Sequence, residues 1–155
     1  MTIDRNTLLF FDASCLIAAA GNPQGGSGFL LSLCAKKFLN GAVSQPVLLE
    51  VQRNIQIKLG EETLERFYRL LMVVPFALAP VPPPSELKEL EKIVTAKDTH
   101  VLAATRAIKA SYLLTLDREL VLQVNQANEN FKAFIPGDFI KTLLPSHVEY
   151  PPERD

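Results

Sequence analysis

Two short apolar segments, each followed at once by an aspartate, place the strongest constraint on the fold. Leu8–Phe11 precedes Asp12, and Tyr112–Leu116 precedes Asp117. Continuous apolar runs of this length are typical of strands buried on both faces. In an open parallel α/β sheet, ligands bind beyond the carboxyl ends of the strands. If both strands are central, the two carboxylates converge on one edge of the sheet.

The segments between these strands alternate between helical and strand patterns. Further strands are expected at Ala42–Val43, Met72–Val74 and Phe131–Ile135, with helices between them. Short apolar strands that alternate with helices predict a three-layer α/β/α domain with a central, mostly parallel sheet of four to five strands. We expect a single domain over residues 1–145, and a frayed C-terminal tail over residues 146–155.

Composition excludes several classes of protein. The chain has 155 residues, of which 48% are hydrophobic, so it can bury a core and is not expected to be disordered. Two cysteines do not make a disulfide scaffold and favour a reducing compartment. No apolar stretch is long enough to span a bilayer, so a cytoplasmic protein is expected. The net charge of −1, from 16 basic and 17 acidic residues, argues against a grip on nucleic acid by bulk electrostatics.

Two segments are candidates for linkers or ligand loops. Five of the 11 prolines lie between Pro75 and Pro84, which predicts a stiff extended connector. The segments on either side are short for independent domains, so the connector is interpreted as a crossover within one domain. The glycine-rich segment Gly21–Gly26 lacks the residues of a phosphate-binding loop and is interpreted as a flexible entrance loop.

Two further acids are candidates for the same edge. Asp98 stands three and four residues before Val101 and Leu102, at the start of a predicted helix. Carboxylates that converge in this way raise one another's pKa unless a cation neutralises them, and Mg²⁺ and Mn²⁺ prefer such oxygen ligands. The alternative is that Asp12, Asp98 and Asp117 each cap a helix. By spacing alone, Glu50 is more typical of a solvated helix residue.

At these four acids the sequence resembles the PIN-domain family of metal-dependent ribonucleases. The resemblance is strongest to toxin components of type II toxin–antitoxin modules of the virulence-associated protein C type. It rests on four motifs in the family's order, which are Leu9-Phe10-Phe11-Asp12-Ala13-Ser14, Ser44-Gln45-Pro46-Val47-Leu48-Leu49-Glu50, Asp98-Thr99-His100-Val101-Leu102-Ala103-Ala104 and Leu113-Leu114-Thr115-Leu116-Asp117-Arg118-Glu119-Leu120. The match runs from about Leu8 to Leu144.

The resemblance implies an endoribonuclease that hydrolyses RNA phosphodiester bonds at an acidic site holding Mg²⁺ or Mn²⁺. The catalytic and metal-binding residues would be Asp12, Glu50, Asp98 and Asp117, and Glu119 would stand in the place of a frequent fifth acid. The resemblance also implies that hydroxyls of Ser14 and Thr115 support the cluster. An antitoxin protein and a second copy of the chain are the implied protein partners. The chain departs from the family at Ala13-Ser14, where Thr-Asn is commoner, and at apolar Leu116.

Two points stay open at the level of the sequence. The alternative function is a catalytically weak or inactive PIN-like protein that binds RNA or a protein partner. Lys36, Lys37, Arg53 and Lys58 are candidate RNA contacts, but solvated helix faces explain them at least as well. His100 is interpreted as a surface residue in the first turn of its helix.

Overall fold

A computed structural model describes residues 2–153 and contains one parallel sheet of five strands. The strands lie in the order β3-β2-β1-β4-β5. Their bounds are β1 Leu8–Phe11, β2 Asn40–Ser44, β3 Ala77–Ala79, β4 Tyr112–Leu114 and β5 Lys132–Phe134. The predicted α/β fold with a parallel sheet is therefore confirmed, and β1 and β4 are central neighbours. Asp12 follows β1 directly, but β4 ends at Leu114, two residues earlier than the expected Tyr112–Leu116, so Asp117 lies beyond the strand.

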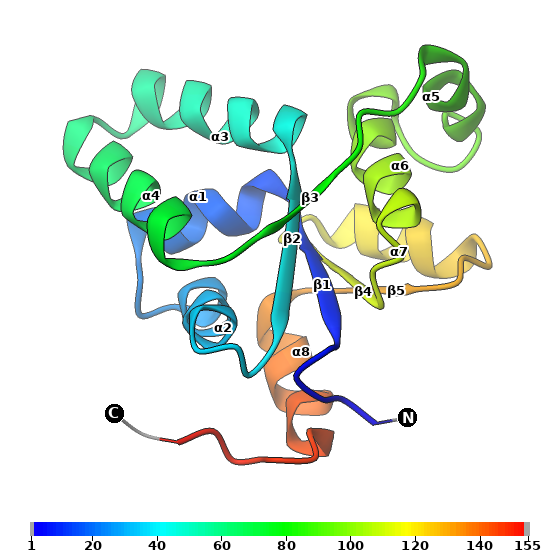
Figure 1. Cartoon of the computed structure of the whole chain (residues 1–155). Helices are drawn as coiled ribbons and strands as arrows, with labels where there is room; N and C mark the ends of the chain where they lie inside the picture. The colour runs from blue at the N-terminus through cyan, green and yellow to red at the C-terminus, as the bar shows by residue number, and fades with distance from the viewer. Residues whose placement is uncertain (1, 154–155) are drawn as a thin grey trace.

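Helices cover both faces of this sheet (Figure 1). Helices α1, α2 and α8 pack together on one face, and α3 and α4 form a pair that packs on α1. Helices α5, α6 and α7 lie on the other side of the sheet. The bounds are α1 Ala13–Gly21, α2 Gly26–Ala35, α3 Gln45–Lys58, α4 Glu61–Val73, α5 Pro84–Leu90, α6 Thr99–Ala107, α7 Arg118–Gln126 and α8 Pro136–Thr142. None of the helices in residues 2–153 has the length and apolar character needed to cross a membrane.

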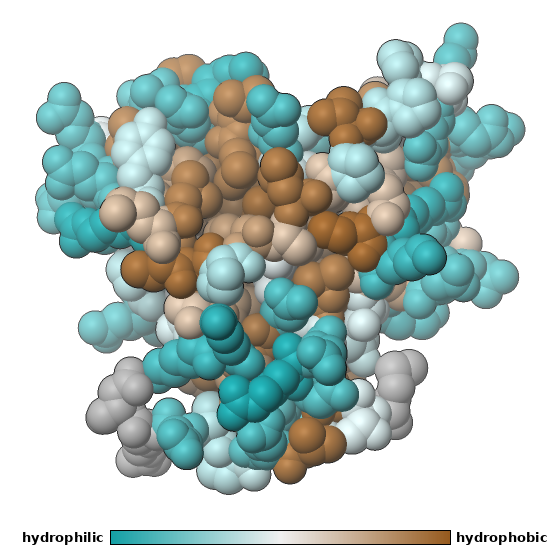
Figure 2. Space-filling view, viewed as in Figure 1, coloured by the Kyte–Doolittle hydropathy of each residue, from teal (hydrophilic) through white to brown (hydrophobic). Residues whose placement is uncertain are grey.

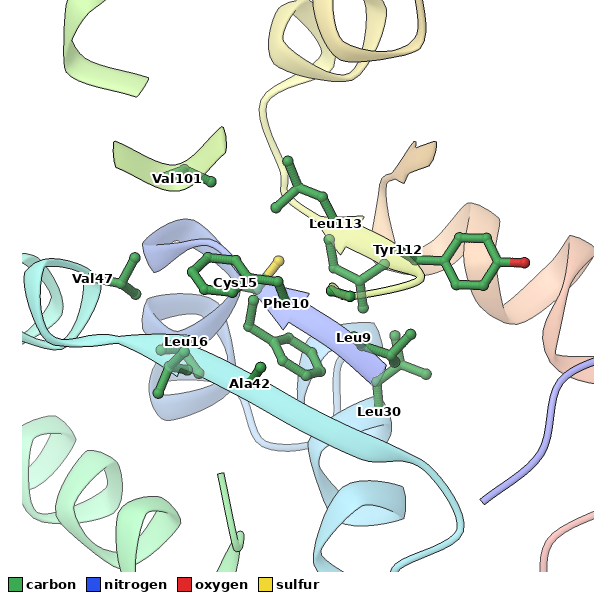
Figure 3. Packing of buried hydrophobic residues seen from close by; sticks show 14 of the residues in the cluster. Leu9, Phe10, Cys15, Leu16, Leu30, Ala42, Val47, Val101, Tyr112 and Leu113 are labelled. Carbon is green, nitrogen blue, oxygen red and sulfur yellow. The ribbon is translucent and has the colours of Figure 1, made fainter. Parts of the chain in front are cut away.

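The core is built around β1, which has a paired strand on either side. Leu9, Phe10 and Phe11 are fully buried, because alternate side chains point to opposite faces and helices cover both. Figure 3 shows side chains of this cluster from β1, β2 and β4 close to side chains from α1 and α2. A core that holds β1 and β4 side by side fixes the positions of the residues that follow these strands.

The edge strand differs from the sequence prediction. Met72 and Val73, expected in a strand, are the last residues of α4, and β3 lies five residues further on at Ala77–Ala79. The helix ends because Pro75 cannot continue it. The strand then occupies the short interval between Pro75 and Pro80 that was interpreted as a connector. Proline is tolerated there because β3 has a partner on one side only.

The loop between α1 and α2 approaches α2 so closely that residue 28 must be glycine. A Cβ built on Gly28 would lie 2.1 Å from the carbonyl oxygen of Pro23. This contact, together with hydrogen bonds from Gly25 N to Asn22 O (3.0 Å) and from Phe29 N to Gly25 O (2.9 Å), fixes the path of the loop. The loop is thus more ordered than the flexible entrance loop that its composition suggests.

The C-terminal segment also differs from the expected frayed tail. His147 is buried, its ring stacks on Phe38 at 3.7 Å, and its Nε2 donates to Phe38 O (2.7 Å) while Nδ1 accepts from Glu149 N (3.0 Å). Val148 N donates to Ile3 O (2.9 Å), beside an isolated parallel bridge between Ile3 and His147. These contacts bind the segment to the N-terminal end of the chain. The last two residues of the expected tail, 154 and 155, lie outside the described residues.

Candidate active site

The carboxyl ends of β1 and β4 bring two motif residues into direct contact. Phe11 pairs with Leu114 in the parallel register, so the residues that follow them, Asp12 and Thr115, leave the sheet side by side. The backbone N–H of Asp12 donates to Leu114 O (2.9 Å) and continues the ladder one step. The Thr115 hydroxyl then donates to Asp12 Oδ2 (2.7 Å). The two halves of the sequence therefore meet at one carboxylate.

Asp12 is held by hydrogen bonds to both of its oxygens. Oδ1 accepts from Ala13 N (2.8 Å), which makes Asp12 the N-cap of α1. Oδ2 accepts from Thr115 and, at a longer distance, from the Ser14 hydroxyl (3.4 Å). Ser14 and Thr115 thus contact the acid that the resemblance pairs them with. Helix capping and a place at the sheet edge, treated as alternatives in the sequence, are combined in one residue.

The surroundings of Asp12 raise its pKa. The residue is only 8% exposed, and burial is the main cause of the increase, because it penalises the charged form. The hydrogen bonds from Thr115 and Ala13 act against it, while the negative charge of Asp98 raises the pKa further. The site therefore holds a carboxylate whose charge is poorly compensated by the protein itself.

Glu50 reaches the same region from α3. This helix starts directly after β2, where the Ser44 hydroxyl accepts from Val47 N (3.3 Å) and Pro46 occupies the first turn. Burial is the first cause that raises the pKa of Glu50, followed by the charge of Asp12, and Asp98 contributes in the same direction. Its Oε1 lies 3.8 Å from His100 Nε2. Glu50 is thus part of the acidic group, although its spacing on the helix favoured a solvated position.

Asp98 precedes α6 but does not cap it with its side chain. Its Oδ2 instead accepts from the Thr95 hydroxyl (3.0 Å). Its charge raises the pKa of both Asp12 and Glu50. Asp12, Glu50 and Asp98 come from three different crossovers of the sheet, and they lie near enough for their charges to act on one another.

Asp117 is connected to this group through Thr115. Asp117 N donates to Thr115 Oγ1 (3.1 Å), and Asp117 Oδ1 caps α7 by accepting from Glu119 N (3.0 Å) and Leu120 N (3.3 Å). Within residues 2–153, the side chain of Glu119 forms no hydrogen bond or ion pair with the other candidate acids. Asp117 is thus positioned by the shared threonine, and Glu119 stands at the margin of the group.

Two residues near the acids were not identified from the sequence. His100 was interpreted as a surface residue, but its side chain is mostly buried, it faces Glu50, and its positive form would lower the pKa of Asp12 and Glu50. The apolar run Val101-Leu102-Ala103-Ala104 that follows His100 is the sequence signal of a helix buried on most of its surface, which would have indicated this position. Lys97 acts on Glu50 in the same direction as His100. Within residues 2–153, His100 Nδ1 is the buried side-chain nitrogen or oxygen without a hydrogen-bond partner.

The candidate RNA contacts divide between the two edges of the sheet. Arg53 and Lys58 lie on α3, the helix that carries Glu50. Lys36 and Lys37 follow α2 and precede β2, so they lie at the amino ends of the strands. The backbone carbonyl of Lys37 accepts from Arg5 (3.3 Å), which belongs to the same end of the molecule. The structure therefore does not bring Lys36 and Lys37 to the acidic group.

The donor set at the carboxyl edge fits a hard divalent cation in chemistry. Its members are carboxylate oxygens, and the pKa values of Asp12 and Glu50 are raised by burial and by neighbouring negative charge, which a bound cation would offset. In the part of the chain that the structure describes, no group of three or more His, Cys, Asp or Glu side chains stands close enough to hold an ion. The side chains are thus of the right kind and share one edge, with their carboxylates spread apart.

Comparisons with known proteins point to one family. A family model described as a PIN domain matches residues 9–119. A search of the curated proteins finds no match.

Solved structures of three proteins share the fold. VapBC2 from Rickettsia felis, in a crystal with a DNA fragment from its promoter, has a TM-score of 0.62 at 18% identity, covering 83% of this chain and 98% of that one. PAE2754 from Pyrobaculum aerophilum has a TM-score of 0.58 at 16% identity, covering 82% and 89%. FitAcB from Neisseria gonorrhoeae has a TM-score of 0.57 at 13% identity, covering 83% and 98%.

Proposed function

This chain belongs to the PIN-domain family, and we propose that it is a Mg²⁺- or Mn²⁺-dependent endoribonuclease acting as the toxin of a toxin–antitoxin module. The observation that carries the proposal is that Asp12, Glu50 and Asp98 share the carboxyl edge of the sheet, where the charge of Asp98 raises the pKa of the other two. Asp117 is linked to Asp12 through Thr115. These four acids are the proposed metal ligands and catalytic residues. PIN domains are generally nucleases, which sets the class of reaction.

The residues of the site have separate tasks in this proposal. A divalent cation held by these acids would supply an activated water and would offset charge on the phosphodiester. Thr115 and Ser14 hold the Asp12 carboxylate in one orientation, so that it meets the cation without reorganisation. His100 faces Glu50, with Nε2 3.8 Å from Oε1. Arg53, one turn after Glu50 on α3, is suited to contact an RNA phosphate.

The test is cleavage of a mixed RNA panel by the purified protein with Mg²⁺, with Mn²⁺ and with EDTA. We expect cleavage only with a divalent ion, and a loss of at least about a hundredfold in Asp12→Asn. Glu91→Gln, an exposed acid-to-amide change outside the site, serves as the matched control and should cleave like the wild type. Cleavage that persists in EDTA or in Asp12→Asn would contradict the proposal. Absence of cleavage by a folded wild-type protein would favour the second function, an inactive PIN-like binding protein.

A groove on the far side of α1 supports the proposed antitoxin partner. Its floor is apolar, with Leu31 from α2 and Leu70 from α4, and its volume is about 430 Å³. Arg66 and Arg69 lie along the same groove, where they pair with Glu62 (3.3 Å) and Glu65 (3.8 Å) of α4. An apolar groove of this kind suits a helix with apolar anchors along one face. We propose such a segment of an antitoxin as its occupant, in line with the toxin–antitoxin proteins among the structural neighbours.

An exposed apolar patch supports the proposed homodimer. Met72 and Val73 at the end of α4, Leu78 in β3 and Val81 just after it are all largely exposed, and we call them the β3-edge patch. Figure 2 shows apolar side chains gathered over this part of the molecule. Contiguous apolar surface of this kind marks protein interfaces. We propose that a second copy covers the patch, and that the protein acts in the cytoplasm, where its two buried cysteines stay reduced.

A further inference from the structure

A small cavity lies directly beside the acidic group. Its volume is about 210 Å³, and its walls come from three separate segments of the chain. Ala18 belongs to α1, Asn22 to the loop after it, and Pro136 and Gly137 to the start of α8. Leu116 closes the remaining side. Leu116 stands between Thr115 and Asp117, so the cavity opens at the same edge of the sheet as the proposed catalytic residues.

A chain of hydrogen bonds joins this cavity to the central carboxylate. Leu116 N donates to Ser14 Oγ (3.0 Å), and the Ser14 hydroxyl contacts Asp12 Oδ2 (3.4 Å). On α1, Ser14 and Ala18 are four residues apart and therefore lie on one face of the helix. The face of α1 that carries Ser14, next to Asp12, thus continues to Ala18 in the wall of the cavity. A substrate positioned at Asp12 has its adjacent groups within reach of this space.

The side chains that line the cavity are uncharged. None of the eight described lining residues offers a cationic side chain to a phosphate or a carboxylate to a metal. The side chain of Leu116 is 44% exposed, and together with the Pro136 ring it presents an apolar surface. Asn22 Oδ1 accepts from Gln24 N (3.3 Å), which leaves the amide NH₂ group as a hydrogen-bond donor. Apolar walls with one amide donor suit a flat, neutral group that packs against the walls and accepts a hydrogen bond at its edge.

The walls are also held in place before any ligand binds. Asn22 N donates to Ala18 O (2.8 Å), and Gly25 N donates to Asn22 O (3.0 Å). The contact of Gly28 with Pro23 fixes the same loop on α2. A preformed site loses little entropy when it is occupied.

We propose that this cavity binds one nucleobase of the RNA substrate, next to the scissile phosphodiester, and so determines where the enzyme cuts. Single-stranded RNA is generally read in this way, by an unstacked base placed against apolar side chains and hydrogen-bonded along its edge. Leu116 and Pro136 provide the apolar contacts and Asn22 the hydrogen bond. The proposal rests on the proposed nuclease function and adds the determinant of its sequence preference.

Gly137 allows the cavity to be filled without strain. A Cβ built on Gly137 meets no atom within 4 Å, and Gly137 lines the cavity, so Gly137→Leu adds a bulky side chain at its wall. Gly21→Leu is the matched control, because a Cβ on Gly21 also meets no atom within 4 Å and Gly21 does not line the cavity. Asn22→Ala removes the amide alone. Thermal melting of the three variants identifies any that are misfolded.

The first measurement maps cleavage sites in a random-sequence RNA with Mn²⁺. We expect the wild type and Gly21→Leu to prefer one base at a fixed position beside the cut by about tenfold, and Gly137→Leu and Asn22→Ala to lose that preference. An unchanged preference in folded Gly137→Leu would overturn the proposal and leave the nuclease function intact. A wild type that cleaves no RNA would instead count against the nuclease function.

The second measurement does not depend on cleavage. Methyl resonances of Leu116 are followed by NMR during titration with four ribotrinucleotides that differ in the central base. The proposal expects a shift with at least one of them, present in Gly21→Leu and absent in Gly137→Leu. No shift with any trinucleotide, or an equal shift in Gly137→Leu, would overturn it.

Discussion

Asp12 carries an energetic cost that the rest of the fold must offset. Its carboxylate is buried, its pKa is raised first by that burial, and Asp98 adds negative charge nearby. Such a residue lowers stability in the charged state unless a cation or proton is present. Sites that bind metal or substrate often carry this type of cost, because the geometry suited to function is not the one suited to stability.

Replacement of Asp12 by Asn is therefore expected to stabilise the metal-free protein at neutral pH. The folded pKa of Asp12 is higher than its unfolded value, so its favourable contribution is complete below about pH 4 and is lost as the pH rises through the folded pKa. Asp12→Asn removes this loss, and its free energy of unfolding should exceed that of the wild type by about 1 kcal/mol at pH 7.5. Urea denaturation in EDTA at pH 4 and pH 7.5 measures both values.

The opposite result for Asp12→Asn would contradict this prediction. If Asp12→Asn is less stable than the wild type at pH 7.5, the hydrogen bonds of the carboxylate outweigh its burial. Glu91→Gln, which changes an exposed acid to an amide, should show neither a gain nor a new pH dependence.

At the residue scale, the sequence identified the acids that follow strands better than those on helices. Asp12 and Asp117 could be predicted because a parallel sheet aligns the ends of its strands. The position of Glu50 could not be obtained from spacing, since the stripe Val47, Val51 and Ile55 points into the core and Glu50 lies to one side of it. Its place depends on how α3 leaves β2, which only the resemblance to a known family supplied. The burial of His100 likewise depends on packing around α6.

At the scale of the elements, the loop between α1 and α2 offers a sharp test of close packing. Gly28→Ala would place a methyl group 2.1 Å from the Pro23 carbonyl oxygen, so the loop must move away from α2. We expect a loss of about 1–3 kcal/mol in the free energy of unfolding. Gly21→Ala is the matched control: it meets no atom within 4 Å at the end of α1, and should leave stability unchanged or raise it by up to about 1 kcal/mol.

Chemical denaturation of the two variants shows whether a loss of stability in Gly28→Ala comes from the steric clash or from the replacement of glycine itself. If both alanine variants lose stability equally, the loop is flexible enough to accept the extra methyl group and the cost is not steric. That result would also remove the argument that the cavity beside Asp12 is preformed.

The strand that the sequence misplaced shows what patterns miss at this scale. Met72-Val73-Val74 is as apolar as a strand, yet Met72 and Val73 continue the helix that precedes them. A short apolar run has no period long enough to separate the two structures. Pro75 and Pro80 delimit β3, but they were interpreted together with Pro82, Pro83 and Pro84 as one connector. The two central strands were easier to predict, because polar residues flank each of them, Thr7 and Asp12 around β1 and Ser111 and Thr115 around β4.

At the scale of the whole molecule, the β3-edge patch predicts the state of association. Leu78 is 62% exposed in an edge strand, among Met72, Val73 and Val81. Leu78→Lys should convert a dimer into a monomer in sedimentation-velocity runs, because a charge at an apolar interface is costly to bury. Leu122→Lys on α7 is the control, since Leu122 is equally exposed (60%) and lies outside the patch. A wild-type monomer, or a dimer that survives Leu78→Lys, would contradict this assignment.

The order of the strands is a property of the whole chain that composition and periodicity do not specify. The parallel sheet and its layers could be predicted, because strands alternate with helices. The order β3-β2-β1-β4-β5 places β1 beside β4, more than one hundred residues later. The pairing of β1 with β4 brings Thr115 to Asp12. The sequence did not predict this pairing, which rested on the assumption that both strands are central.

The contact between the two ends of the chain has a practical consequence for engineering. Ile3 and Val148 are hydrogen-bonded at the amino edge of the sheet, and the two segments that carry them lie at the lower side of the view in Figure 1, away from the start of α3. An affinity handle or fluorescent protein attached beyond either segment would therefore leave the acidic edge open. A reporter meant to sense that edge would instead be inserted in the exposed turn around Gly60, beside α3 and α4.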